Sequence, residues 1–381
     1  MGAIYASAYL TVITASGEDP TYGLPTISRS FDAGGTFSGS YLFPETTVVH
    51  TSKWATRAWT FQESLQSRRR LFFTDHGLIF HCSVDTASSK RKGNVLLLQD
   101  LALSEFTCHR YKTPMIDMMC ILEQYVSRDL SFDSDALNAI VGVLRTFAAQ
   151  AAQNPGGTVY HMWAVAFQFS SESELLVALN WYSTADLRSH TARRRGFPSW
   201  SPLGWSCKDI AFEDSKDQFK SWNCASNLTR TTKTPPVIKL WDGNDTRLID
   251  PQRFDVSAFA TQCLQITAKS VRLSQTYLGS SYHGKYDFLH RYYFFVSHEG
   301  KVLSFRPSWD DKTRTHDIIT VFTCLFTTWP YLVHGLILEE HGAVFERVGY
   351  LTRSNIPRKL QRDASKIIMH DDIKVRSCLI C

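Results

Sequence analysis

Short segments rich in β-branched and aromatic residues dominate the chain from Phe254 onward. Such residues favour strands, and short strands that follow one another closely are typical of an antiparallel sheet or sandwich. The segments are CLQITAKSVRL, YYFFVS, IITVFTCLF, LVHGLIL and AVFERVGYL. We therefore expect a β-rich antiparallel region in the C-terminal part of the chain.

One stretch of this region, Ile318–Leu338, contains no Asp, Glu, Lys or Arg. A transmembrane helix needs roughly 20 residues of sustained apolar character. Pro330 and His334 interrupt the stretch, and threonine is frequent within it. We therefore expect two buried strands with a turn near Trp329 and Pro330, and no transmembrane segment.

Strand signals also occur in the first 82 residues. Met1–Ala8 resembles the end of a short helix, and the β-branched residues of Tyr9–Ser16 predict a buried strand. Further along, Arg70–Thr74 and Leu78–Cys82 flank Asp75-His76-Gly77, a short turn that contains glycine. This pattern predicts a β-hairpin.

A helical pattern precedes the hairpin. The spacing of four, three and four residues between Trp54, Ala58, Phe61 and Leu65 places these apolar side chains on one face of a helix. The motif Arg57-Ala58-Trp59-Thr60-Phe61-Gln62-Glu63 therefore lies on that helix.

Within this motif, Trp59 and Glu63 are four residues apart and share one face of the predicted helix. We expect Trp59 to be buried and Glu63 to be partly exposed beside it. Two interpretations remain open. The indole and the carboxylate could form a pocket wall, or Glu63 could form a surface ion pair with Arg57 or a nearby arginine, worth roughly 0–1 kcal/mol.

Two further helices are expected in the next part of the chain. The first covers Phe106–Val126, and Ser134 is the expected N-cap of the second. The apolar face of the second helix consists of Leu137, Val141, Leu144 and Ala148.

The composition changes after Asn154-Pro155-Gly156-Gly157, where a tryptophan-rich region begins. We expect an α+β protein with three segments: an α/β portion over residues 1–82, a helical segment over 83–153, and loops followed by β-rich structure over 154–381. The loop Phe197–Trp205 is rich in Pro and Gly and holds three aromatic residues. These aromatic side chains are expected to pack into the core and not to line a ligand site.

The overall composition indicates a globular protein. The 381 residues are 44% hydrophobic and 20% charged, which excludes a disordered chain. The net charge of +5 is mild, and no groove-reading motif is present, so no specific nucleic-acid partner is expected.

Nine cysteines without a framework spacing favour reduced thiols in a cytoplasmic protein over a disulfide scaffold. The N-terminal sequence has no basic region followed by a long apolar one, so no secretory signal is expected. The final residues Cys378-Leu379-Ile380-Cys381 have the C-a-a-X shape of a prenylation motif, but the terminal Cys is not a usual X residue, so a plain disordered tail is expected and prenylation is the alternative.

Common catalytic motifs are missing from the sequence. It contains no Gly-rich phosphate loop and no G-x-S-x-G nucleophile elbow. The pairs His81-Cys82 and Cys108-His109 are adjacent, which is not the spacing of a zinc site, so no metal is expected.

Several segments resemble the fungal heterokaryon-incompatibility (HET) domain. The N-terminal MGAIYASAYLTVITASGEDPTYGLP is similar to the end of the second conserved block of that domain, and RAWTFQE is similar to the third block. Downstream, DALNAIVGVL, FPSWSPLGW and FERVGYL resemble segments that commonly follow the domain. The strands that open the domain in the family have no counterpart, so we expect that the chain lacks the N-terminal half of the domain.

The resemblance implies a fold related to Toll/interleukin-1 receptor (TIR) domains and a role in cell death after incompatible fungal individuals fuse. Some TIR domains cleave NAD with a Glu in a W-C-x-x-E helix motif, and Trp59 and Glu63 have that spacing. In such chemistry a carboxylate stabilises the oxocarbenium-like transition state at the ribose. The resemblance thus implies Glu63 as the catalytic candidate, Trp59 as a pocket wall and NAD as a possible substrate.

The resemblance therefore implies a heterokaryon-incompatibility protein that acts in non-self recognition and programmed cell death, and the cysteine pattern indicates the cytoplasm. We expect protein partners or self-association, no bound cofactor and no catalysis by this chain. The alternatives are an NAD-cleaving effector, a NAD glycohydrolase centred on Glu63, and a fragment without function.

Overall fold

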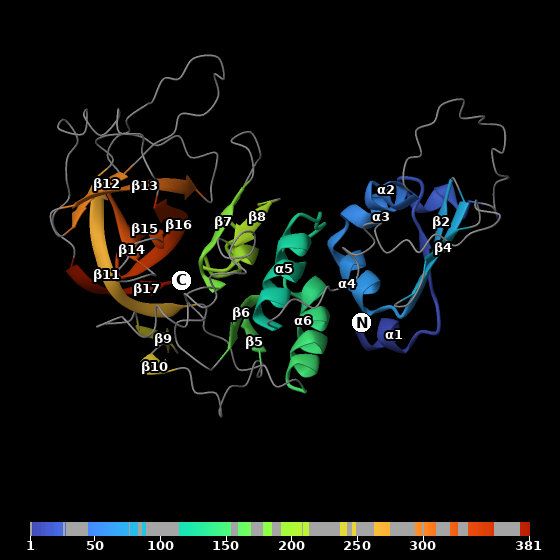
Figure 1. Ribbon diagram of the computed structural model, residues 1–381, viewed down its shortest axis with the longest axis horizontal. Helices are drawn as coiled ribbons and strands as arrows, with labels where there is room; N and C mark the ends of the chain where they lie inside the picture. The colour runs from blue at the N-terminus through green and yellow to red at the C-terminus, as the bar shows by residue number, and fades with distance from the viewer. Residues whose placement is uncertain are drawn as a thin grey trace, which may run out of the picture. The chain divides into compact units, whose positions relative to one another are not determined.

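The computed structural model contains both helices and strands, which makes this an α+β protein. The chain forms two compact units, Met1–Gly156 and Gly157–Cys381 (Figure 1). The structure describes residues 2–25, 27, 45–75, 77–82, 86–88, 114–153, 159–168, 178–184, 192–207, 209–212, 237–241, 246–248, 263–274, 294–298, 301–309, 321–326, 334–353 and 374–381.

The first unit contains a four-stranded sheet in the order β1-β2-β3-β4. Strand β1 (Thr11–Thr14) runs parallel to β2 (Arg69–Thr74), while β3 (Gly77–Cys82) and β4 (Thr86–Ser88) continue the sheet in antiparallel fashion. Parallel neighbours require a crossover connection. The described residues of this connection include the short helices α2 (Glu45–His50), α3 (Lys53–Thr56) and α4 (Ala58–Gln66).

One face of this sheet forms a small core. Ile13, Val49, Phe72 and Ile79 are buried together, and Trp54 packs against them. The expectation of a fully buried strand over Tyr9–Ser16 is wrong, because side chains alternate across a strand and Val12 on the other face is 53% exposed.

The predicted hairpin is confirmed. β2 and β3 pair from Arg69 opposite Cys82 to Thr74 opposite Gly77. The Thr74 hydroxyl donates a hydrogen bond of 2.7 Å to the Gly77 carbonyl and closes the turn. His76 in the middle of the predicted turn lies outside the described residues.

The remaining helices of the first unit are α1 (Gly2–Ser7), α5 (Pro114–Val126) and α6 (Asn138–Ala151). Helices α4, α5 and α6 pack against one another (Figure 1), and α1 contacts α4 and α6. The helix expected over Phe106–Val126 is confirmed from residue 114, and residues 106–113 lie outside the described part.

The predicted start and face of α6 are wrong in part. Ser134 lies in the 3-10 turn η4 (Asp133–Asp135), and the helix begins after Leu137, whose side chain makes no capping hydrogen bond. Because α6 packs against both α4 and α5, its buried face is broad. That face consists of Ala139, Ile140, Val143, Leu144 and Ala151, so Leu144 alone of the expected stripe is fully buried.

The second unit is rich in β-structure. Two small antiparallel sheets consist of β5 (Val159–Met162) with β6 (Val165–Gln168) and β7 (Trp181–Ser183) with β8 (Ile210–Phe212). The 3-10 turn η5 covers Pro202–Gly204. The strands of the nine-stranded sheet are β9 (Val237–Trp241), β10 (Thr246–Leu248), β11 (Leu264–Ser274), β12 (Phe294–His298), β13 (Lys301–Trp309), β14 (Val321–Phe326), β15 (His334–His341), β16 (Val344–Arg353) and β17 (Lys374–Ile380).

Five of these strands form a closed hydrogen-bonded ring. β11 pairs with β14, β14 with β15, and β15 with β16, while β17 pairs with both β16 and β11. The contact of β16 with β17 is parallel, and the other pairings in the ring are antiparallel. Alternate side chains of β11, such as Leu264 and Ile266, are buried in one core with Leu336, Tyr350 and Ile380.

Two strands lie in the uncharged stretch Ile318–Leu338, as predicted: β14 and the first part of β15. These two strands pair antiparallel, from Phe322 opposite Glu339 to Phe326 opposite Gly335. Residues 327–333, which include the expected turn, lie outside the described part. Across the described residues, no helix is long and apolar enough to span a membrane.

The tryptophans of the loop Phe197–Trp205 are core residues, as predicted. Trp200 and Trp205 are completely buried, and the Trp205 indole donates a hydrogen bond of 2.9 Å to the Ser199 carbonyl. The Trp181 indole donates to the Trp200 carbonyl, also at 2.9 Å. The buried indole N–H groups of Trp181 and Trp205 therefore each have an acceptor, which removes the cost of burying them.

An unpredicted arginine joins this loop to the sheet. Arg347 on β16 is fully buried and lies over the Trp181 ring. Its guanidinium donates to the carbonyls of Leu179 and Trp181, and its backbone N–H donates to the Ser199 hydroxyl at 2.9 Å. A charged group in an apolar core is tolerated when its donors are satisfied in this way.

The expectation of reduced cysteines is wrong for one pair. Cys263 and Cys381 form a disulfide between the start of β11 and the end of β17, two strands that pair directly. The expected disordered tail is also wrong, because Lys374–Ile380 forms strand β17. The prenylation alternative is wrong in this fold as well, because Cys378 is buried within β17 and Cys381 is bonded to another sulfur. Burial raises the pKa of the Cys378 thiol to about 11.

Candidate functional site

The motif Arg57–Glu63 forms a break between two helices and the first turns of the second. Arg57 ends α3 and begins α4 with extended backbone angles of φ −82° and ψ 138°. The Ala58 N–H donates to the Asp129 carbonyl and the Asp129 N–H to the Thr56 carbonyl, which anchors the break. The predicted continuous helix over Trp54–Leu65 is therefore wrong at Arg57.

Most motif residues are buried in this arrangement. Ala58, Thr60, Phe61 and Gln62 are each at most 2% exposed, whereas Arg57 is exposed. The Thr60 hydroxyl hydrogen-bonds to the Arg57 carbonyl at 2.6 Å, which satisfies a backbone acceptor at the break. The motif thus has a structural role that is independent of any chemistry.

Glu63 is partly exposed, as predicted, but its neighbours differ from those expected. Its carboxylate accepts a long hydrogen bond of 3.4 Å from the Trp54 indole. Burial raises the pKa of Tyr5, and the nearby Glu63 carboxylate raises it further. No ion pair joins Glu63 to Arg57 or to another cation among the described residues, so the surface ion-pair interpretation is wrong there.

Trp59 is half-buried, so the prediction that it is buried is wrong. Its indole N–H donates to the Asp135 carboxylate at 3.3 Å, on the side of α6 and η4. Trp54 takes the place beside Glu63 because the break at Arg57 turns α3 back toward the sheet. There its ring packs edge-on against Phe72, with centroids 5.6 Å apart.

Trp59 borders a pocket of about 340 Å³ between α1, α4 and α6. Gln62 lines it from the same helix, while Gly2 and Ala3 line it from α1. The residues that α6 contributes are Asn138, Val141, Gly142, Arg145 and Thr146. Glu63 does not line this pocket, so the two residues of the expected catalytic site have different surroundings.

A buried Arg–His pair lies between α4 and the sheet. Arg70 and His81 are direct cross-strand partners on β2 and β3, with Nη2 of Arg70 2.6 Å from Nδ1 of His81. Arg70 also donates to the Ser64 carbonyl at 3.0 Å and to its hydroxyl at 2.9 Å. The sequence shows both residues, but nothing in their spacing indicates that they pair.

This pair requires a neutral imidazole. Arginine only donates hydrogen bonds, so Nδ1 of His81 must accept and the ring proton must sit on Nε2. Burial, together with the Arg70 charge, lowers the pKa of His81 to about 4. Burial likewise lowers the pKa of Arg70 to about 10, which leaves it charged at neutral pH.

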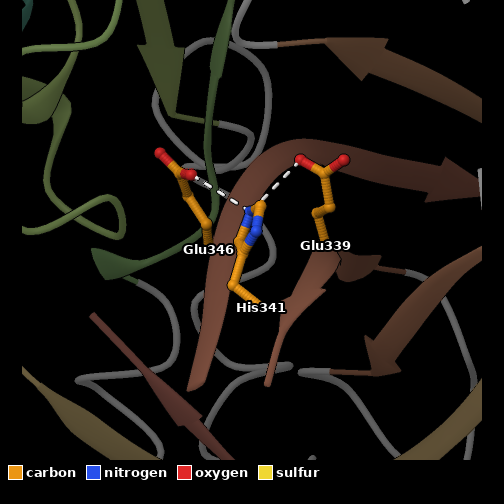
Figure 2. A group of neighbouring side chains, drawn as sticks. All are labelled: Glu339, His341 and Glu346. Atoms are coloured by element: carbon orange, nitrogen blue, oxygen red, sulfur yellow. Dashed lines mark ion pairs between the residues drawn. The ribbon is translucent and has the colours of Figure 1, made fainter. Parts of the chain in front are cut away.

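A second group of chemically capable side chains lies on the β15–β16 hairpin of the second unit (Figure 2). Nε2 of His341 is 3.4 Å from carboxylate oxygens of both Glu339 and Glu346. The two glutamates are direct cross-strand partners, an arrangement that repels unless a cation intervenes. Sequence analysis missed this group because the hairpin brings its members together.

These three donors could hold a divalent cation, but the cluster already contains a fixed cation. Nε of Arg193 donates to Glu346 at 2.7 Å and forms an ion pair with it. Arg193 also lies over the Trp205 ring and donates to the Gly204 carbonyl, so it is held in place. The group is therefore better described as an ion-pair network that fixes the Trp-rich loop to β16.

Comparisons with protein-family models, with curated proteins and with solved structures give no match to this chain.

Proposed function

We propose that this chain is a heterokaryon-incompatibility protein of the cytoplasm, which acts in fungal non-self recognition and programmed cell death through protein contacts or self-association. Its resemblance to HET sequences supports this role. The parallel pair β1 and β2, with helices in the connection, is compatible with a TIR-like portion. The motif Arg57–Glu63 forms the helical break and core of that portion.

In this proposal the chain is not catalytic, and the position of Glu63 is the observation that supports this. A glycosidic carboxylate must face the ribose of a nucleotide held in register, and a displacement of about 1 Å can cost a hundredfold in rate. Glu63 instead accepts a long hydrogen bond from the Trp54 indole, lies near Tyr5 and does not line the pocket beside Trp59.

Expression in a fungal host tests the proposal. We expect the wild-type chain to arrest growth, and we expect Glu63→Gln to arrest growth equally, because the amide oxygen can still accept from Trp54. Arg68→Gln serves as the surface control, since Arg68 is exposed and outside the motif. The purified proteins are expected to release no nicotinamide from NAD.

Two results would contradict the proposal in different ways. Nicotinamide release that Glu63→Gln abolishes would favour an NAD-cleaving effector centred on Glu63. A chain that neither arrests growth nor releases nicotinamide would favour a fragment without function.

A further inference from the structure

The pocket between α1, α4 and α6 has an unusual floor. Gln62 is 2% exposed and its side chain lines the pocket. Among the described residues, its amide has no hydrogen-bond partner. The amide atoms are not sealed by protein, so the groups that can pair with them are those that enter the pocket. The open side of this amide is the pocket.

Gly142 makes room for the Gln62 amide that lines the pocket, and Gly2 makes room for the neighbouring Gln66 amide, which does not line it. A Cβ atom at Gly142 would lie 2.2 Å from Oε1 of Gln62, and one at Gly2 would lie 2.3 Å from Oε1 of Gln66. Oε1 of Gln66 is itself buried without a partner in the described part of the chain. Glycine within a helix costs roughly 1 kcal/mol relative to alanine, so Gly142 indicates that this space is needed.

The walls supply an aromatic face and a cation. The hydrogen bond from the Trp59 indole to Asp135 fixes the orientation of the ring. Arg145 is exposed at the rim, and Asn138 and Thr146 add polar groups. The volume of about 340 Å³ is at the small end of the range for ligand pockets, roughly 300–1,000 Å³.

We propose that this pocket binds a small planar ligand that carries an anionic group. The polar edge of the ring would pair with the Gln62 amide, its face would contact Trp59, and its phosphate or carboxylate would pair with Arg145. Two sources supply this chemistry, a nucleoside monophosphate and an aromatic carboxylic acid. The site is separate from Glu63 and does not depend on the proposed role in cell death.

Isothermal titration of the full-length protein tests the proposal with four probes. AMP and indole-3-carboxylate each carry a ring and an anion, whereas adenosine lacks the anion and ribose 5-phosphate lacks the planar ring. We expect AMP or indole-3-carboxylate to bind, and which of them binds identifies the source. Adenosine and ribose 5-phosphate are each expected to bind at least about tenfold more weakly than the anionic ring compound that binds.

Two variants locate the binding. Arg145→Gln removes the rim cation from an exposed position and is expected to weaken binding about tenfold, while Arg68→Gln, an exposed control, leaves it unchanged. Gly142→Ala adds a methyl group that must displace the Gln62 amide into the pocket, so binding should be lost while circular dichroism still shows a folded protein. No binding of either anionic probe at millimolar concentration, or equal binding by wild type and both variants, would overturn the proposal.

Discussion

The Arg70–His81 pair shows how one buried residue ties folding to pH. The imidazole is neutral because it accepts a hydrogen bond from a charged guanidinium in a buried site. Protonation would place two cations 2.6 Å apart, with little water to screen them. The fold therefore excludes the charged form of His81.

This exclusion predicts a loss of stability in mild acid. The pKa of His81 is about 4 in the folded chain and near 6.5 when unfolded, so the unfolded chain binds the proton first as the pH falls. The contribution of neutral His81 to the free energy of unfolding is complete above pH 6.5 and declines, by up to about 3 kcal/mol, as the pH falls to 4. Urea unfolding at several pH values measures it.

His81→Asn is the matched variant for this measurement, because its amide oxygen can accept from Arg70 without titrating. The difference between wild type and variant isolates His81 from His334, whose pKa burial also lowers to about 4. A difference that does not change with pH between 6.5 and 4 would contradict the assignment.

Glu63 carries a second prediction at this scale. Glu63→Gln should change the free energy of unfolding by less than about 0.5 kcal/mol, because the amide oxygen still accepts and no ion pair is lost among the described residues. A loss above about 1.5 kcal/mol in chemical denaturation would show that the charge itself stabilises the fold.

At the scale of elements, the structure on the two sides of α4 shows what sequence patterns can and cannot predict. The hairpin that follows it was predictable, because alternation and a glycine turn are local signals. The break at Arg57 was not, because it depends on backbone hydrogen bonds to Asp129, far along the chain. The same break explains why Trp54, and not Trp59, lies beside Glu63.

This arrangement reverses the expected importance of two aromatic residues. Phe61 is completely buried against Tyr125, so Phe61→Ala should cost about 3–5 kcal/mol. Trp59 is half-buried, and Trp59→Ala should cost about 1–2 kcal/mol. Thermal melts of both variants, recorded together, test this order, and an equal or larger loss for Trp59→Ala would contradict it.

At the scale of the whole molecule, α+β character and the β-rich second part followed from composition and pattern. The closed ring of five strands could not be predicted in this way, because it depends on the pairing of β11 with β17, whose disulfide-bonded cysteines are 118 residues apart. No local signal in either strand specifies so distant a partner. The Glu339–His341–Glu346 group was hidden for a related reason, since pairing register decides which side chains meet.

The disulfide predicts a stability difference for the second unit. Reduction, or the double variant Cys263→Ser with Cys381→Ser, should lower its free energy of unfolding by about 2–4 kcal/mol. Calorimetry with and without reductant measures this, and the double variant is the control, because reductant should not change its melt. A wild-type melt that is insensitive to reductant would argue against the bond.

The ring also sets an order of events during folding. The two-residue turn at Gly342, where φ is +67°, allows β15 and β16 to pair within microseconds of collapse. β17 must instead find β11 across more than a hundred residues, which makes its docking a slow step. Until it docks, β11 and β16 expose unpaired backbone edges, and a strand from a second copy of the chain could take its place. Crowded synthesis therefore raises the chance that nascent copies exchange this strand before each ring is completed.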